Sequence, residues 1–196
     1  MRESLRLVVS VLVTCMVAAT GLALTYAVAA PRIEEQDRLA QERSLKAVMP
    51  EADGFDAVED EELIKVATSA AEPATLTAIY RAKRGGSEIG WAVRVSSRGY
   101  GGPMHLVIGL DTSGSVTGVS ILSMNETPGL GTKVLSEKWF LAQFVGLPPG
   151  FDDQDVRALD VIAGSTRSAN GIRDGVAAAG RAYDKALQGR EEAANE

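Results

Sequence analysis

The sequence has few of the residues that form disulfides or bind metals. Its 196 residues include one Cys and one His. One cysteine excludes a disulfide framework, a thiolate zinc site and an iron–sulfur cluster, and one histidine excludes a metal site with several imidazoles. The lone His105 cannot build a Ser-His-Asp catalytic site either, because no Gly-x-Ser-x-Gly motif accompanies it. We therefore expect neither a metal site nor a catalytic residue of these kinds.

Aromatic residues and an excess of positive charge are also lacking. Aromatics make up 5% of the chain, and 20 Lys and Arg stand against 26 Asp and Glu, which gives a formal net charge of -6. This acidic balance argues against a nucleic-acid partner. The 20 glycines indicate instead that loops rich in accessible backbone matter here.

Charged residues are absent from Leu7 to Pro31, a stretch rich in Val, Leu and Ala. A helix of about 20 apolar residues crosses the hydrocarbon core of a bilayer. Arg2 and Arg6 precede the stretch and favour a cytoplasmic N-terminus. The sequence therefore predicts a single-pass anchor in the inner (cytoplasmic) membrane, with the bilayer as a partner and the rest of the chain on the extracytoplasmic, or periplasmic, side.

A cleaved secretory signal is the alternative for this stretch. Ala27-Val28-Ala29 is similar to a small-residue cleavage site. The apolar run is longer than the roughly 7–15 residues of a signal sequence, which favours an uncleaved anchor. Both alternatives export the remaining residues, which number enough for one domain.

Three segments describe the expected layout: residues 1–31 as cytoplasmic N-terminus and anchor, 32–50 as a juxtamembrane helix, and 51–196 as the extracytoplasmic domain. Charges fill most of the juxtamembrane helix, and Pro50 stops it. We interpret it as a solvated stalk that continues the membrane helix. Residues 51–74 receive no assignment.

The middle of the domain alternates with a period of two, which predicts a meander of about four strands with one face buried. Gly85-Gly86 between two such runs indicates a hairpin. We expect strands at 76–83, 89–95, 104–111 and 115–124, helices at 134–146 and 165–189, and a further strand at 157–164. The predicted fold class is α+β: one N-terminal transmembrane helix, then a small, mostly antiparallel sheet packed by helices.

The first candidate site is the loop at 125–133, where two glycines permit close approach of backbone to a ligand. Leu130 stands between these glycines and is suited to pack on a flat ligand face. The alternative is a plain strand-to-helix turn capped by Thr132 or Ser136. The candidate binding residues are Glu126, Thr127, Gly129, Leu130, Gly131, Thr132 and Lys133.

The second candidate site is the segment 160–168, where small residues lead into the last predicted helix. Ser165, Thr166 and Ser168 lie at the helix N-terminus, whose unpaired N–H groups and dipole favour an anion such as phosphate. Arg167 adds positive charge. The alternative is ordinary N-capping by Ser or Thr.

A third glycine-rich stretch, 98–103, separates two predicted strands, and we interpret it as a turn. Tyr100 within it is suited either to stack on a ring or to cover the edge of the core. His105 lies on a strand and is predicted to face away from the core.

Taken together, these segments resemble the FMN-binding domain family. The resemblance rests on the single N-terminal span, the Gly-Tyr-Gly-Gly-Pro-Met run (99–104), the Glu-Thr-Pro-Gly-Leu-Gly run (126–131) and the Asp-x-x-x-Gly-Ser-Thr segment (160–166). Within the family, the chain is most similar to the G subunit of the Rnf-type ion-translocating complex. The C subunit of the sodium-pumping NADH:quinone reductase is the related alternative.

The resemblance implies that FMN is linked covalently, through a phosphodiester, to a threonine hydroxyl. A flavin transferase makes this bond from FAD. The family's Ser-Gly-Ala-Thr motif matches residues 163–166, so Thr166 is the implied acceptor, next to Gly164 and Ser165. Ala163 and Ser165 depart from the motif but remain small. Ser165 and Ser168 stay open as alternative acceptors.

The implied function is electron relay through FMN in an Rnf-type ion-translocating ferredoxin/NADH oxidoreductase, as one subunit among others and not as an enzyme alone. The isoalloxazine ring is implied to lie near residues 126–133. The alternatives are an anchored assembly or binding module without flavin, and the equivalent FMN subunit of the quinone reductase. Flavoproteins of the nitrous-oxide regulatory type fit less well, because they carry more spans and cysteine motifs.

Overall fold

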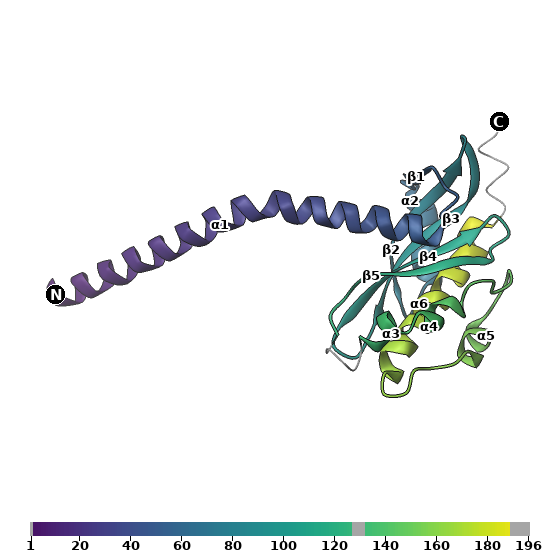
Figure 1. Ribbon diagram of the computed structural model, residues 1–196. Coiled ribbons are helices and arrows are strands. Elements are labelled where there is room, and N and C mark those ends of the chain that lie inside the picture. The colour runs from purple at the N-terminus through teal and green to yellow at the C-terminus, as the bar shows by residue number, and fades with distance from the viewer. Residues whose placement is uncertain (1, 127–131, 189–196) are drawn as a thin grey trace. The chain divides into compact units, whose positions relative to one another are not determined.

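The computed structural model describes residues 2–126 and 132–188 (Figure 1). By contacts between Cα atoms the chain divides into two compact units, residues 1–41 and residues 42–196. Each unit is described by itself below.

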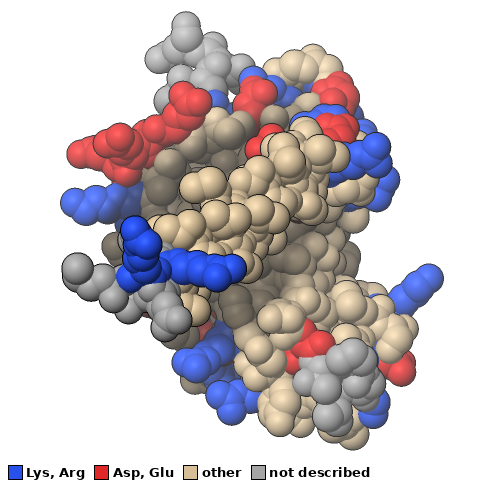
Figure 2. Space-filling view, turned by 90° about the vertical axis from the view of Figure 1, so that its left-hand side faces the viewer, with Lys and Arg blue, Asp and Glu red and all other residues tan. Residues whose placement is uncertain are grey.

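The first unit is the greater part of helix α1 (Arg2–Val48), which includes Pro31. Its most apolar 18-residue window has a mean hydropathy of 2.4, and among the described residues it is the one helix long and apolar enough to cross a membrane. The hydroxyls of Thr14 and Thr20 donate to carbonyls four residues earlier, at 2.9 and 2.8 Å. These bonds satisfy polar groups that would be costly in lipid. Figure 2 shows an uncharged tract, drawn in tan, between charged side chains at its margins.

The second unit contains one five-stranded antiparallel sheet whose strand order follows the chain. The predicted four-strand meander is present, and one further strand from the unassigned segment pairs at its edge. The strands are β1 (Gly54–Ala57), β2 (Thr75–Arg84), β3 (Ser87–Arg98), β4 (Pro103–Asp111) and β5 (Val116–Met124).

The hairpin between β2 and β3 turns on Gly85 and Gly86, with φ of 59° and 86°. Positive φ at both turn residues is the twist that suits a two-residue hairpin, and glycine adopts it without strain. Arg84 pairs with Ser87 across the turn. The Gly-Gly signal in the sequence therefore sets the register of the two longest strands.

Helices cover one face of this sheet, and Figure 1 shows α6 along it. The apolar residues predicted to recur along the last helix, Ile172, Val176, Ala179, Tyr183 and Leu187, are all buried. They form one core with the inner side chains of β3 and β4. The predicted α+β fold is thus confirmed. The helices are α2 (Glu61–Ala70), α3 (Lys133–Ser136), α4 (Lys138–Ala142), α5 (Asp153–Ala158) and α6 (Thr166–Ala182), followed by the π-helical turn η1 (Tyr183–Leu187).

The other face of the sheet carries the last turn of α1. Leu45, Val48 and Met49 are buried there in a second apolar cluster. A Cβ added to Gly109 or Gly118 would lie 2.7 Å from a backbone atom of Val48, so these glycines admit the helix. The prediction of a solvated stalk is therefore wrong for this turn, because its apolar residues reach a surface made flat by glycine.

Two further expectations from the sequence are corrected by the structure. Residues 134–146 do not form one helix, because Glu137, at φ -89° and ψ 82°, separates α3 from α4. Residues 157–164 are not a strand: α5 ends at Ala158, and the segment after it is without regular structure. Asp152 begins α5 with a capping box, a signal that dominates the short apolar run after it.

Candidate functional site

The N-terminus of α6 exposes one hydroxyl and buries two. Ser165 is the N-cap residue, and its side chain makes no capping hydrogen bond. Thr166 and Arg167 at the first turn are exposed, whereas Ser165 and Ser168 are only 4% and 1% exposed. Of the three hydroxyls considered from the sequence, Thr166 is therefore the one that a modifying enzyme can reach.

Lys133 lies next to this helix start although it is 31 residues away from Gly164 in the chain. Its Nζ atom is 3.7 Å from the position that a Cβ on Gly164 would occupy. Gly164 has a φ of +81°, a left-handed conformation that favours glycine. The two candidate segments of the sequence are thus brought together: the ammonium group of one lies against the turn that begins α6 in the other.

The helix start also contains an unpaired polar group. The buried Ser168 Oγ in the first turn of α6 has no hydrogen-bond partner. Buried hydroxyls are normally paired, so an unpaired one at a helix N-terminus suits a ligand that accepts hydrogen bonds. An exposed threonine, an open helix N-terminus and a neighbouring ammonium group together fit a phosphoryl group.

Side chains outside the predicted set hold the segment before α6 in place. The Gln143 amide donates to the Asp160 carbonyl at 3.0 Å and accepts from the Asp160 N–H at 2.9 Å. Arg173 donates to the carbonyl of Leu159, and burial lowers the pKa of its guanidinium below the usual value. No local pattern marks these two residues in the sequence, because both act on backbone distant in the chain.

The turn at 99–102 is joined to the first residue of the Glu-Thr-Pro-Gly-Leu-Gly run. The Glu126 carboxylate accepts from the N–H of Tyr100 at 2.7 Å and from the N–H of Gly101 at 3.1 Å. Tyr100 is 62% exposed, so it does not cover the edge of the core. The predicted turn is present and closed by a bond from the Gly99 N–H to the Gly102 carbonyl at 2.9 Å.

The remaining residues of the candidate loop are only partly described. Thr132 is the N-cap residue of α3 but makes no side-chain capping bond, and the Ser136 hydroxyl instead donates to the Lys133 carbonyl at 3.0 Å. The expected capping by Thr132 or Ser136 is therefore not seen. Four predicted contacts lie outside the described residues: Thr127, Gly129, Leu130 and Gly131.

His105 takes no part in a metal site. It is half-buried on β4, and its Nδ1 atom has no hydrogen-bond partner. Among residues 2–126 and 132–188, no group of three or more His, Cys, Asp or Glu side chains is arranged to hold a metal ion.

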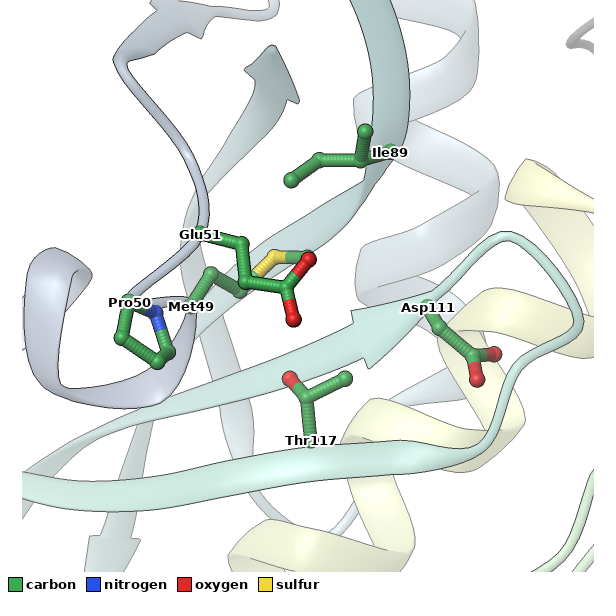
Figure 3. A pocket seen from close by; sticks show the side chains of 6 residues that line it. All are labelled: Met49, Pro50, Glu51, Ile89, Asp111 and Thr117. Atoms are coloured by element: carbon green, nitrogen blue, oxygen red, sulfur yellow. The ribbon is translucent and has the colours of Figure 1, made fainter. Parts of the chain in front are cut away.

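A cavity of about 390 Å³ lies at the sheet face that receives α1, away from the start of α6 (Figure 3). Its two carboxylates are already engaged: Glu51 pairs with Arg84, and Asp111 accepts from the N–H of Ser113 at 2.9 Å. The cavity therefore does not belong to the candidate site. Its lining residues are Met49, Pro50, Glu51, Ile89, Asp111 and Thr117.

The geometry agrees with comparisons to known proteins. Residues 99–180 match the FMN-binding domain family, and this range contains the turn at 99–102, the candidate loop and the start of α6. The likeness to a solved structure supports the fold: the C subunit of the Na⁺-translocating NADH-quinone reductase from Parabacteroides distasonis has a TM-score of 0.52 at 17% identity, over 79% of this chain and 95% of that one. The class is thus a protein with an FMN-binding domain.

Relatives of higher identity define the family more closely. The G subunit of the Na⁺-translocating ferredoxin:NAD⁺ oxidoreductase complex of Acetobacterium woodii is 32% identical over 82% of this chain and 82% of its own length. The G subunit of the ion-translocating oxidoreductase complex of Stutzerimonas stutzeri is 34% identical over 83% of this chain and 73% of its own length. The chain belongs to the G-subunit family of ion-translocating oxidoreductase complexes.

Proposed function

We propose that this protein is the membrane-anchored FMN subunit of an Rnf-type ion-translocating ferredoxin/NADH oxidoreductase, in which it relays electrons. Membership of the G-subunit family and the FMN-binding domain at 99–180 support the proposal. The long apolar helix α1 supports membrane anchoring. The protein acts with the other subunits of the complex and not alone.

FMN is attached to Thr166 through a phosphodiester. The observation that carries this step is the exposed Thr166 at the open start of α6, with Lys133 beside Gly164 and with the competing Ser165 and Ser168 buried. In the attachment, Thr166 Oγ1 forms a bond to the phosphorus nearest the riboflavin part of FAD and loses its proton. The bond between the two phosphates of FAD breaks, AMP leaves, and a flavin transferase catalyses the exchange.

The chain holds the resulting diester by charge and by backbone donors. One negative charge remains on the diester, and the N-terminus of α6 stabilises it. Lys133 adds a cation, while Gly164 and the small Ser165 keep the approach to Thr166 open. The ring lies by Thr132 and residues 127–131, whose backbone N–H groups tune its electronics.

Bound FMN supplies the electron-transfer chemistry. The chain's own residues bind and orient it, and none is required as a general acid or base. Covalent attachment also suits an exported domain, because the cofactor cannot diffuse away from it.

The layout of the chain follows from this function. Residues 1–31 are the cytoplasmic N-terminus and anchor in the bilayer, residues 32–50 the juxtamembrane helix, and residues 51–196 the domain on the extracytoplasmic side. Arg2 and Arg6 support this orientation. The flavin transferase then meets the domain outside the membrane.

The test is in-gel flavin fluorescence of the denatured protein, made together with the flavin transferase. We expect a fluorescent wild-type band and a dark Thr166→Ala band, with Ser165→Ala and Ser168→Ala as controls that stay fluorescent. A dark wild-type band contradicts covalent attachment and favours an assembly module without flavin. Fluorescence that persists in Thr166→Ala and disappears in a serine variant moves the acceptor to that serine.

A further inference from the structure

Glu126 is the point at which two glycine-rich segments of the chain meet. Its carboxylate accepts two hydrogen bonds from consecutive backbone N–H groups, those of Tyr100 and Gly101, at 2.7 and 3.1 Å. Two donors facing two acceptor oxygens make a charge-assisted, geometrically defined contact. A side chain of the candidate loop thereby fixes backbone that is 25 residues earlier in the chain.

The turn leaves no room for any other arrangement of this carboxylate. A Cβ on Gly99 would lie 2.0 Å from Glu126 Oε1, and one on Gly101 would lie 2.4 Å from the carbonyl oxygen of Asn125. Neither distance is possible between real atoms. The glycines at these positions are thus explained by the approach of residues 125–126, not only by the bend of the turn itself.

The same turn lies against α6 on its other side. A Cβ on Gly171 would lie 2.6 Å from the carbonyl oxygen of Arg98, so the end of β3 touches the helix there. Gly171 is five residues after Thr166, or about 7.5 Å along the helix axis. The turn is therefore held between Glu126 and the first turns of the helix that carries the acceptor threonine.

We propose that Glu126 is a positioning residue of the flavin site: through two backbone N–H groups it holds the turn 99–102, with the exposed Tyr100, beside the start of α6. This inference rests on the proposed attachment of FMN at Thr166. It replaces the expectation that Glu126 contacts the flavin, because both oxygens already serve the turn. Glu126 shapes the wall that the flavin meets and takes no part in the chemistry.

The test compares Glu126→Ala and Glu126→Gln with wild type, each as the full-length protein with FAD and the flavin transferase. The matched control is Asp53→Ala. The Asp53 carboxylate also accepts from a turn N–H, that of Gly85 at 2.6 Å, but at the hairpin between β2 and β3. Three quantities are measured: the initial rate of covalent attachment, the midpoint potential of the attached flavin and the thermal midpoint of the protein.

We expect Glu126→Ala to slow attachment about tenfold, the equivalent of about 1.4 kcal/mol. We expect its flavin potential to move toward that of free FMN, because the surrounding backbone is less fixed. Glu126→Gln keeps one acceptor oxygen and should fall between Ala and wild type. Asp53→Ala should match wild type in rate and potential.

Wild-type rate and potential in Glu126→Ala overturn the positioning role. Equal losses in Glu126→Ala and Asp53→Ala that follow only the thermal midpoint also overturn it, because they indicate general stability. If Glu126→Ala does not fold, Glu126→Gln carries the test by the same criteria. A wild-type protein without covalent flavin contradicts the proposed function instead, so the two failures are distinguishable.

Discussion

Two helices in this domain begin in opposite ways. At α5 the Asp152 carboxylate accepts from the N–H groups of Gln154 and Asp155 at 2.7 and 3.0 Å, and the Asp155 carboxylate accepts from the Asp152 N–H at 3.0 Å. This capping box pairs backbone donors that a helix start leaves open. At α6 the N-cap Ser165 makes no side-chain capping bond, and the Ser168 hydroxyl in the first turn has no partner.

The difference teaches where an anion belongs. An acidic cap already occupies the donors of α5, and its charge would repel a phosphate. The start of α6 has no acidic cap, and Lys133 and the exposed Arg167 bring positive charge to it. Both starts have residues that are usual for caps, so residue type alone does not distinguish a capped start from a binding start.

Reversing the charge beside α6 should have the largest effect on this comparison. In Lys133→Glu a carboxylate replaces the ammonium group next to Gly164. We expect the initial rate of covalent flavin attachment to fall about 100-fold, because an attraction becomes a repulsion worth about 2.7 kcal/mol in total. The rate is followed by in-gel fluorescence over time with FAD and the transferase.

Lys138→Glu, at the start of α4, is the matched charge reversal and should attach flavin at the wild-type rate. Lys133→Arg keeps the charge and should retain most of the activity. Equal rates for Lys133→Glu and wild type would show that the ammonium group does not assist the phosphoryl group.

The glycine before α6 should give the next largest effect. Gly164→Ala places a Cβ at φ +81°, and Gly146→Ala places one at φ +84° after α4, where nothing lies within 4 Å. Each should cost about 1–2 kcal/mol of stability through backbone strain. Thermal unfolding should therefore shift similarly in both variants, while attachment slows only in Gly164→Ala. A similar loss of attachment in both would assign the effect to stability.

Local patterns in the sequence predict much of this fold. The Gly85-Gly86 turn and the period-two runs indicate the meander, and the helical spacing from Ile172 to Leu187 indicates the buried stripe of the last helix. Each signal lies within one element, so neighbouring residues are sufficient to read it. The candidate acceptor segment at 163–166 is also visible, because small residues and hydroxyls precede an apolar helix.

The rest depends on contacts between distant parts of the chain. Nothing local indicates that Lys133 lies by Gly164, that Gln143 holds the Asp160 backbone, or that Glu126 closes the turn at 99–102. The wrong strand at 157–164 has a different cause. Its apolar residues fit a strand as well as the edge of a core, and the Asp152 cap that begins α5 stands in a segment whose prolines and glycine are typical of a loop.

Removing the cap of α5 should have a smaller effect, and on stability alone. Asp152→Ala leaves the first N–H groups of the helix without a side-chain acceptor, which typically costs about 1 kcal/mol. For a protein of this size, the thermal midpoint should fall by about 3 °C. Circular dichroism of the full-length protein in detergent measures it. Flavin attachment should be unchanged, and a parallel loss of attachment would contradict the separation of the two helix starts.

The smallest expected effect is the binding of inorganic phosphate to the protein without flavin. If the start of α6 is an anion site, phosphate at a concentration equal to its dissociation constant stabilises the folded state by about 0.4 kcal/mol. The thermal midpoint should rise by about 1 °C. Phosphate also stabilises proteins generally through exclusion from their surface, so the rise by itself proves nothing. Lys133→Ala separates the two causes, because it should lose the specific part while Asp152→Ala keeps it. Equal shifts in both variants would mean that the open start of α6 accepts phosphate only when the phosphate is part of a flavin.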